Sequence, residues 1–144
     1  HQLAGRDDLL IITNDFAIAA YLMNNTQSEI YHTGGKIDRE NQSSIGGKVA
    51  EFLAGINIDI AFISSSSWNL KGLSTPCENK VLVKQAIIQA ANTNYLISDS
   101  TKYGRIATFH ALDLSALDGV ITDIDLSSSV IDELQDKGIK VINS

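Results

Sequence analysis

Apolar and polar residues follow one another along this chain in two patterns, and each pattern predicts a different kind of element. Short, mainly apolar runs bounded by polar residues are typical of strands buried in a parallel sheet. Such runs lie at 9–13, 29–33, 58–63, 95–98, 119–122 and 139–142. Longer stretches between them carry apolar residues every three or four positions, which is the spacing of one helix face. This alternation of strands and helices predicts an α/β fold, with a mostly parallel sheet and helices on both faces.

The helical spacing occurs in four stretches, at 14–25, 46–55, 77–92 and 127–138. Asn14 or Asp15 can cap the first helix, and a glycine follows the last apolar position of the second and the fourth. The residues expected to face the core are Ile18, Tyr21, Leu22, Val49, Phe52, Leu53, Leu82, Val83, Ala86, Ile87, Ala90, Ala91, Val130, Ile131 and Leu134. The polar segment 37–44 predicts a loop or an edge strand, whereas 105–114 fits neither pattern.

Length and composition add limits to this picture. The 144 residues suffice for one domain with a full core, and no linker or repeat divides them, so we predict a single domain over 1–144. The net charge of −6 argues against binding of nucleic acid by this chain alone, because phosphate contacts need clustered Lys and Arg. One cysteine cannot form an internal disulfide, and there is no signal peptide or long apolar run. We therefore expect a cytoplasmic protein without a membrane span.

The segment 96–105 carries the most informative chemistry in the chain. A short apolar run ends there in Asp99, Ser100, Lys102 and Tyr103, followed by a glycine. In an α/β sheet, ligands bind in the crevices outside the carboxyl ends of the strands. Lys102 supplies a positive charge with three donors, and Asp99 either orients it, accepts from a sugar hydroxyl or bonds its own turn. Tyr103 either faces the ligand or packs at the sheet edge. This pattern predicts a site for a small phosphorylated metabolite.

Other candidate ligand groups follow or precede predicted elements. Gly34 and Gly35 form a sharp turn after the second strand, where backbone amides can face a phosphate. Asn14 either binds the ligand or only caps its helix. Thr75 and Glu78 lie around the start of the longest helix, where the helix dipole favours an anion, although Glu78 can equally stabilise the first helical turn.

Taken together, these motifs resemble the C-terminal effector-binding domain of the DeoR family of bacterial transcription regulators, over nearly the whole chain. The motifs that carry the resemblance are Thr13-Asn14, Gly34-Gly35, Gly46, Asp59-Ile-Ala-Phe62, Gly72-Leu-Ser-Thr75, Glu78, Lys84, Asp99-Ser-Thr-Lys-Tyr-Gly104 and Ile121-Thr-Asp123. Their order and spacing are much more specific than any one of them.

The resemblance implies a fold like that of sugar-phosphate isomerases, glucosamine-phosphate deaminases and CoA-transferases. It implies a phosphorylated sugar or a related metabolite as effector, a role in repressing sugar-metabolism genes and assembly into homo-oligomers. DNA would be bound only through an N-terminal helix-turn-helix domain, which is absent from this sequence. His110 has no ligand spacing with a cysteine or a pair of carboxylates, so we predict no metal, and we expect no cofactor and no catalytic residue.

Two departures from the family pattern bear on the ligand. After the third strand the family usually has Gly-Ala-Asp-Gly, and this chain has four serines at 64–67, so the family aspartate falls on Ser66. The first motif usually ends in serine, and here it ends in Asp15, whose carboxylate would repel a phosphate unless it points away to cap the helix. A ligand other than a typical sugar phosphate is therefore an alternative.

Two other functions remain open beside the sensor. An isomerase or deaminase acting on a sugar phosphate needs a positioned base, for which Glu78 and Asp99 are available. A scaffold with a decayed pocket would bind no ligand at all. Lys84 is expected on a solvated helix face or in a salt bridge. Trp68 is expected in a loop at the mouth of the site, stacked on a ligand or on a neighbouring subunit.

Overall fold

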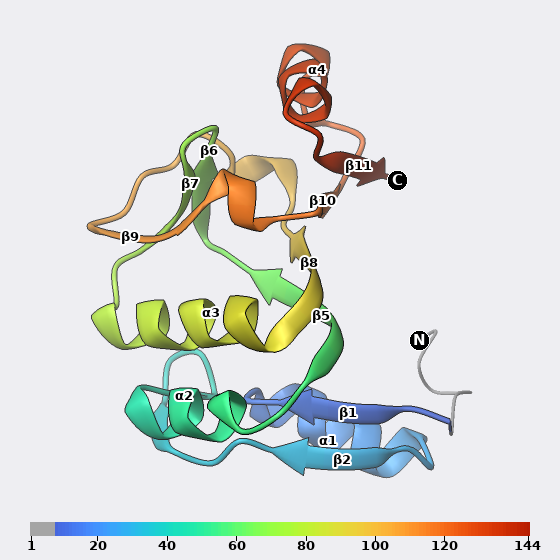
Figure 1. Ribbon diagram of the computed structural model, residues 1–144, viewed down its shortest axis with the longest axis vertical. Helices are drawn as coiled ribbons and strands as arrows, with labels where there is room; N and C mark the ends of the chain where they lie inside the picture. The colour runs from blue at the N-terminus through green and yellow to red at the C-terminus, as the bar shows by residue number, and fades with distance from the viewer. Residues whose placement is uncertain (1–7) are drawn as a thin grey trace.

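The computed structural model describes residues 8–144 and is built around a four-stranded parallel sheet in the order β11-β10-β8-β5 (Figure 1). The strands are β5 (Ile58–Ser64), β8 (Ala91–Ile97), β10 (Gly119–Thr122) and β11 (Lys140–Asn143). The order of these strands in the sheet is their order along the chain, and every neighbouring pair is parallel. The α/β class predicted from the apolar runs is confirmed.

The first two strands form a separate parallel pair. β1 (Leu10–Thr13) and β2 (Glu29–His32) pair in register from Leu10 opposite Glu29 to Thr13 opposite His32. No ladder among the described residues joins this pair to β5, so the predicted sheet is divided in two. A short hairpin follows β2, formed by β3 (Lys36–Asp38) and β4 (Ser43–Ile45), where the sequence predicted a loop or an edge strand.

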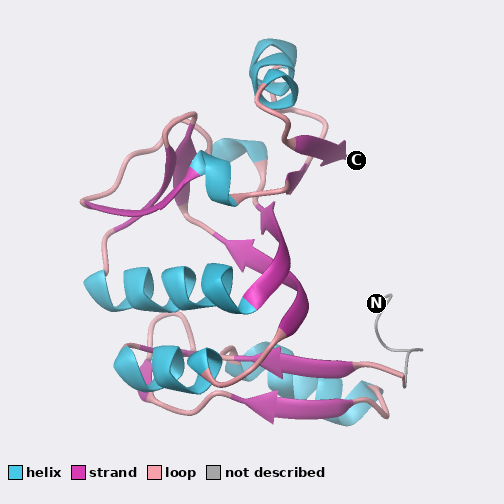
Figure 2. Ribbon diagram, in the orientation of Figure 1, coloured by secondary structure: helices cyan, strands magenta, loops and turns pink. Residues whose placement is uncertain are grey.

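All four predicted helices are present. They are α1 (Phe16–Asn25), α2 (Gly47–Ala54), α3 (Glu78–Ala90) and α4 (Ser128–Asp136), and Figure 2 shows them in cyan against the magenta strands. Asp15 caps α1, because its Oδ1 accepts from the Ile18 amide at 2.8 Å. Ser127 caps α4 by accepting from the Val130 amide. The carboxylate of Asp15 is thus engaged by its own helix.

Part of the predicted core is wrong. Ile18 and Tyr21 are 51% and 38% exposed, and α1 buries only Leu22 fully among its residues. α1 packs on the two strands β1 and β2, so it needs a narrower apolar stripe than a helix in a full layer. Leu82 is 45% exposed, because α3 turns the neighbouring Val83 toward α2. Ala91 is the first residue of β8 and not part of the helix.

The sequence did not predict an antiparallel sheet of three strands. β6 (Ser67–Asn69), β7 (Gly72–Thr75) and β9 (Phe109–Asp113) pair in the order β6-β7-β9. β9 lies in the segment that fitted neither pattern. Gly72 is required at its position, because it has φ +137° and a Cβ there would lie 2.0 Å from the Leu112 carbonyl oxygen.

Trp68 belongs to the core and not to a loop at the mouth of a site, which corrects the sequence prediction. It is fully buried on β6 and packs with residues from the parallel sheet, β7, β9 and α4. A second, smaller cluster of Val49, Leu53 and Val83 joins α2 to α3. Ile12 of β1 and Ile58 of β5 both pack against this second cluster.

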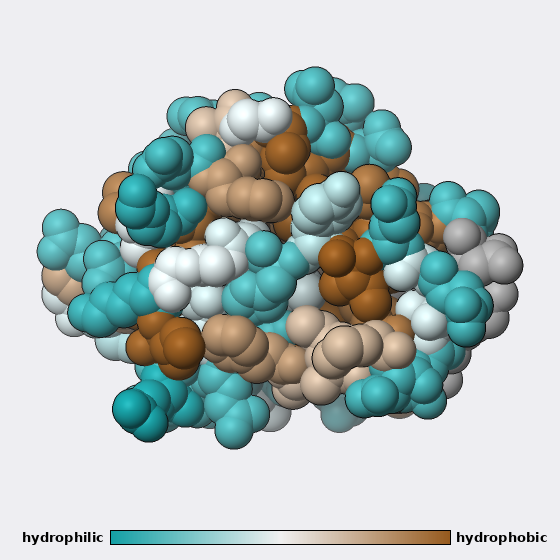
Figure 3. All heavy atoms as spheres, turned by 90° about the horizontal axis from the view of Figure 1, so that it is seen from below, coloured by the Kyte–Doolittle hydropathy of each residue, from teal (hydrophilic) through white to brown (hydrophobic). Residues whose placement is uncertain are grey.

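The two faces of the four-stranded sheet have different surroundings. The face with Ile63, Leu96 and Val120 is buried under α3, α4 and the antiparallel sheet. On the opposite face, the side chains at alternate positions are largely exposed, and these are Ile60 (53%), Phe62 (58%), Ile97 (45%) and Ile142 (40%). Apolar side chains also reach the surface on α1 and β2, and the view from below in Figure 3 shows apolar atoms in patches between polar ones.

Candidate functional site

The loop after β8 is organised by two carboxylates. Asp99 accepts hydrogen bonds from both the amide and the hydroxyl of Thr101. It thereby caps the short 3₁₀ helix η1 (Ser100–Lys102). Asp123, directly after β10, accepts from the Ser100 amide at 3.1 Å. The hydrogen bond from the Thr101 hydroxyl lowers the pKa of Asp99, and Lys102 adds to this effect. The bond from the Ser100 amide likewise lowers the pKa of Asp123, so both groups are carboxylates at neutral pH.

Tyr103, the next residue, packs against the core. Its ring meets Trp68 edge-on at a centroid distance of 4.9 Å, and the Gly104 amide donates to the Trp68 carbonyl at 2.8 Å. Burial raises the pKa of the Tyr103 phenol, and the charge of Glu133 on α4 raises it further. Tyr103 therefore anchors the loop that carries Asp99, Ser100 and Lys102.

Lys84 is a candidate site residue whose contact with β5 the sequence did not indicate. It lies on α3, and its Nζ donates a hydrogen bond to the carbonyl oxygen of Ser64, the last residue of β5. Burial lowers the pKa of Lys84 from 10.5 to about 8, and the positive charge of Lys80 adds to this effect. The expected solvated or ion-paired lysine is instead an ammonium held at the carboxyl end of a strand. The signal available in the sequence was its place among the motifs of the family resemblance.

The strand ends that carry these groups are neighbours. Ser64 of β5 pairs with Ile97 of β8, and the Ser98 amide donates to the Ile121 carbonyl of β10 at 3.1 Å. The carboxyl ends of three adjacent strands therefore present Lys84, the η1 loop and Asp123 along one edge of the sheet.

A second group of predicted residues surrounds the ends of β1 and β2. The Asn14 side chain donates to the Ser44 carbonyl at 2.7 Å and so ties β1 to β4. The Gly34 amide donates to Nδ1 of His32 at 3.1 Å, whereas Gly35 lies against Val49 at the start of α2. Both glycines have positive φ, which explains the residue type at this turn.

The start of α3 lies beside this second group. A Cβ on Gly46 would contact the Asn79 side chain, and Lys80 forms an ion pair with Asp38 of β3 at 3.5 Å. The buried Thr75 hydroxyl accepts from the Cys77 amide at 3.2 Å and so helps to begin the helix. Glu78 is exposed in the first turn. Lys80 and Lys84 thus extend from the second group to the first along one helix.

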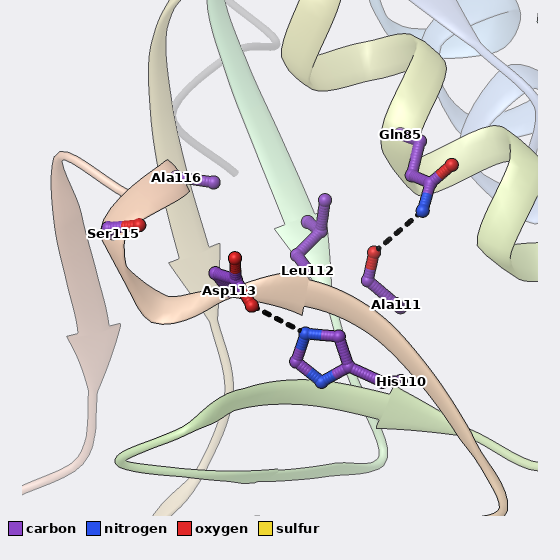
Figure 4. Close-up of a pocket in the computed structure, with 7 residues that line it drawn as sticks. All are labelled: Gln85, His110, Ala111, Leu112, Asp113, Ser115 and Ala116. Atoms are coloured by element: carbon purple, nitrogen blue, oxygen red, sulfur yellow. Dashed lines mark hydrogen bonds and ion pairs between the residues drawn. The ribbon is translucent and has the colours of Figure 1, made fainter.

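Two shallow hollows lie on another side of α3. One of about 320 Å³ is lined by Gln85 and by residues of β9 and η2 (Leu114–Ala116), and Figure 4 shows its members. There His110 Nε2 and Asp113 Oδ1 are 2.7 Å apart, and Gln85 donates to the Ala111 carbonyl. The second hollow, of about 380 Å³, includes Glu78 and Leu82. Neither hollow is lined by Lys102, Asp99 or the two glycines.

Over residues 8–144 we find no group of three or more His, Cys, Asp or Glu arranged to hold a metal ion. Across the same residues, no helix combines the length and apolar character needed to cross a membrane.

A parallel sheet with positive and hydrogen-bonding groups along its carboxyl edge is the architecture of an α/β domain that binds small molecules. Residues 1–124 match the model of the DeoR C-terminal sensor domain, and the chain belongs to that family, whose α/β fold is like that of sugar isomerases.

Similar curated proteins carry regulator names. The chain is 59% identical over 122 residues to an uncharacterized HTH-type transcriptional regulator of Haemophilus influenzae, covering 85% of this chain and 48% of that protein. It is 48% identical over 128 residues to the uncharacterized HTH-type transcriptional regulator YgbI of Escherichia coli K12, covering 89% of this chain and 50% of that protein. It is 28% identical over 142 residues to the glycerol-3-phosphate regulon repressor of the same strain, covering 98% and 56%. The chain thus spans about half the length of these relatives.

Proposed function

We propose that this domain senses a small phosphorylated metabolite, a sugar phosphate or a close relative, for a regulator that represses genes of carbohydrate metabolism. The observation that carries the proposal is the ammonium of Lys84, held at the carboxyl end of β5 beside the loop that bears Lys102. A phosphate is recognised by charge and by hydrogen-bond donors, and both are concentrated along this edge. The name of the glycerol-3-phosphate regulon repressor, said of that relative, agrees with a phosphorylated ligand.

The positive groups of the edge are suited to an anion because they are only partly satisfied by the protein. Lys84 bonds to a neutral carbonyl oxygen and faces a second positive charge at Lys80. A phosphate placed near both would relieve that repulsion and would favour the charged form of Lys84. Lys80 also forms an ion pair with Asp38, so an anion that binds near Lys80 would compete with the Asp38 carboxylate for its charge.

Regulation requires that the ligand bind two arrangements of the protein unequally. Lys80 connects the β3-β4 hairpin to α3, and Lys84 connects α3 to β5. An anion that attracts both lysines would therefore move the hairpin relative to the sheet. In a longer regulator, DNA would be bound by the helix-turn-helix part, and the proposed homo-oligomer would transmit this movement to it.

The test is ligand-dependent thermal stability. We expect the melting temperature of the chain to rise with millimolar sugar phosphates or glycerol 3-phosphate, because a ligand of the native state stabilises it. Lys102→Ala should remove the rise without lowering the melting temperature of the free protein. Lys48→Ala is the matched control, because the Lys48 side chain is 78% exposed on α2. A panel of such compounds with no shift, or an equal shift in the wild type, in Lys102→Ala and in Lys84→Met, would refute the proposal.

An isomerase or deaminase is the second candidate, and the candidate bases argue against it. One carboxylate oxygen of Asp99 accepts two hydrogen bonds from Thr101, and the lowered pKa of Asp99 makes it a weak base. Glu78 stabilises the start of α3. Turnover of ribose 5-phosphate or glucosamine 6-phosphate that disappears in Glu78→Gln or Asp99→Asn would favour the enzyme.

A further inference from the structure

The four-stranded sheet has an unpaired edge at β5 and one bare face, and the β1-β2 pair has an unpaired edge at β1. β5 pairs with β8 on one side only, and β1 pairs with β2 on one side only, among the described residues. Yet Ile12 of β1 and Ile58 of β5 pack against the same apolar cluster. The arrows of β1, β2 and β5 all point to the left in Figure 1. One parallel strand between β1 and β5 would join the two sheets into one.

The bare face beside this gap carries large apolar side chains. Phe62 and Tyr95 are stacked with ring centroids 6.1 Å apart, and the Tyr95 ring lies against Gly119, where a Cβ would be 2.5 Å from it. Ile60 and Ile97 extend the surface on either side and are about half exposed. Parallel sheets are almost always covered on both faces. A patch of this kind on a parallel sheet therefore indicates a missing layer.

The handedness of the connections says which layer is missing. Strand-helix-strand connections between parallel neighbours are right-handed. From β5 to β11 the chain moves one way across the sheet, and α3 and α4 lie on one face. From β1 to β2 it moves the opposite way, which places α1 on the other face. A strand in the gap that leads through a helix into β1 also moves that way, so its helix falls on the bare face.

We propose that the gap between β1 and β5 receives a strand, and the bare face a helix, from a segment that precedes this chain in a longer polypeptide. The curated relatives are about twice as long as this chain, so polypeptides of that length have room for such a segment. The strand would be apolar on both sides, and the helix would place an apolar stripe on Phe62, Tyr95 and Ile97. The bare face carries no carboxylate at its alternating positions, which suits an apolar helix.

This segment would also affect the proposed ligand site. The carboxyl end of the inserted strand would lie between the end of β1, with Asn14, and the end of β5, with Ser64 and Lys84. These are the two groups of candidate residues that the described part of the chain leaves apart. This consequence rests on the proposed function, whereas the inserted strand and helix do not.

The test compares the 144-residue chain with a polypeptide extended at its N-terminus to the length of the relatives, without ligand. Hydrogen exchange of the peptides covering 10–13 and 58–64 should slow in the longer polypeptide. Phe62→Lys should lower its melting temperature by roughly 5 °C or more, because the ring is then buried, and should change the 144-residue chain little. Ile106→Lys is the matched control, since Ile106 is 79% exposed outside the sheet.

Equal effects of Phe62→Lys in both polypeptides, or unchanged exchange in β1 and β5, would overturn the proposal. Dimers of the 144-residue chain that Phe62→Lys dissociates, with no added protection in the longer polypeptide, would also overturn it, because a second copy would then be the partner. Neither result depends on a ligand, so failure of this inference is distinguishable from failure of the proposed function.

Discussion

Replacing Lys84 with methionine tests the electrostatics of the candidate site directly. The pKa of Lys84 is about 8 in the folded chain, whereas an unfolded lysine has its ordinary value of 10.5. Between these pH values the unfolded chain binds more protons than the folded chain. The free energy of unfolding of the wild type therefore increases as the pH rises through this window. At about 1.36 kcal/mol for each pH unit, the whole window is worth roughly 3 kcal/mol.

Methionine keeps an unbranched apolar side chain of nearly the same length but has no proton to lose. The Lys84→Met variant lacks the pH-dependent gain, so its stability relative to the wild type should be highest near pH 7. That advantage should shrink by up to about 3 kcal/mol as the pH approaches 10.5. Other groups titrate equally in both proteins, and their contributions cancel in the difference.

The assay is urea unfolding at pH 7 and pH 10, followed by the fluorescence of Trp68, which is the single tryptophan and is fully buried. Lys48→Met serves as the control, because Lys48 is on the solvated face of α2 and should show no such difference. A difference between Lys84→Met and the wild type that is constant or grows with pH would refute the reasoning. A bound anion should raise the pKa of Lys84, so affinity for phosphate compounds should also fall above pH 8.

The remaining predictions concern backbone, cap and charge. Gly72→Ala should lower the free energy of unfolding by about 3 kcal/mol or more, because the new Cβ meets the Leu112 carbonyl. Gly104→Ala should lower it by about 1 kcal/mol, from its positive φ alone. Urea unfolding of both variants measures the contrast, and equal losses would contradict it. Asp15→Ala should lower stability by about 1 kcal/mol through loss of the α1 cap, which thermal unfolding would detect. Ser66→Asp should raise the pKa of Lys84 by adding a negative charge two residues from its carbonyl partner, so the rise in stability between pH 8 and 10.5 should shrink.

The elements that the sequence predicted well are those whose own residues specify them. The runs at 58–63 and 119–122 are apolar enough to be strands in any parallel sheet, and Asp15 and Ser127 cap helices through local bonds. The antiparallel sheet depends instead on contacts between distant segments. β9 pairs with β7 across more than thirty residues, and its pattern in sequence carries no signal for that partner.

The site shows the same division. Asp99 organises its own loop, and the motif around it was recognisable in the sequence. Lys84 acts on Ser64, twenty residues earlier in the chain, and only the packing of α3 against β5 brings them together. The sequence predicts Trp68 in a loop at the mouth of the site. Its burial follows from the β6-β7 hairpin, which the sequence did not predict.

The serines after β5 determine how Lys84 is used. The Ser65 hydroxyl donates to the Ser67 carbonyl at 2.7 Å, and the Ser67 hydroxyl donates to the Ser74 carbonyl at 2.8 Å, so these two side chains build the turn into β6. Ser66, where the family pattern has a carboxylate, is exposed and brings no negative charge to this edge. Lys84 therefore bonds to a neutral backbone oxygen. An ammonium without a carboxylate partner retains its attraction for an anion, which a salt bridge would have reduced. The departure that put a sugar-phosphate ligand in doubt is, in this arrangement, a reason to expect an anionic ligand near Lys84.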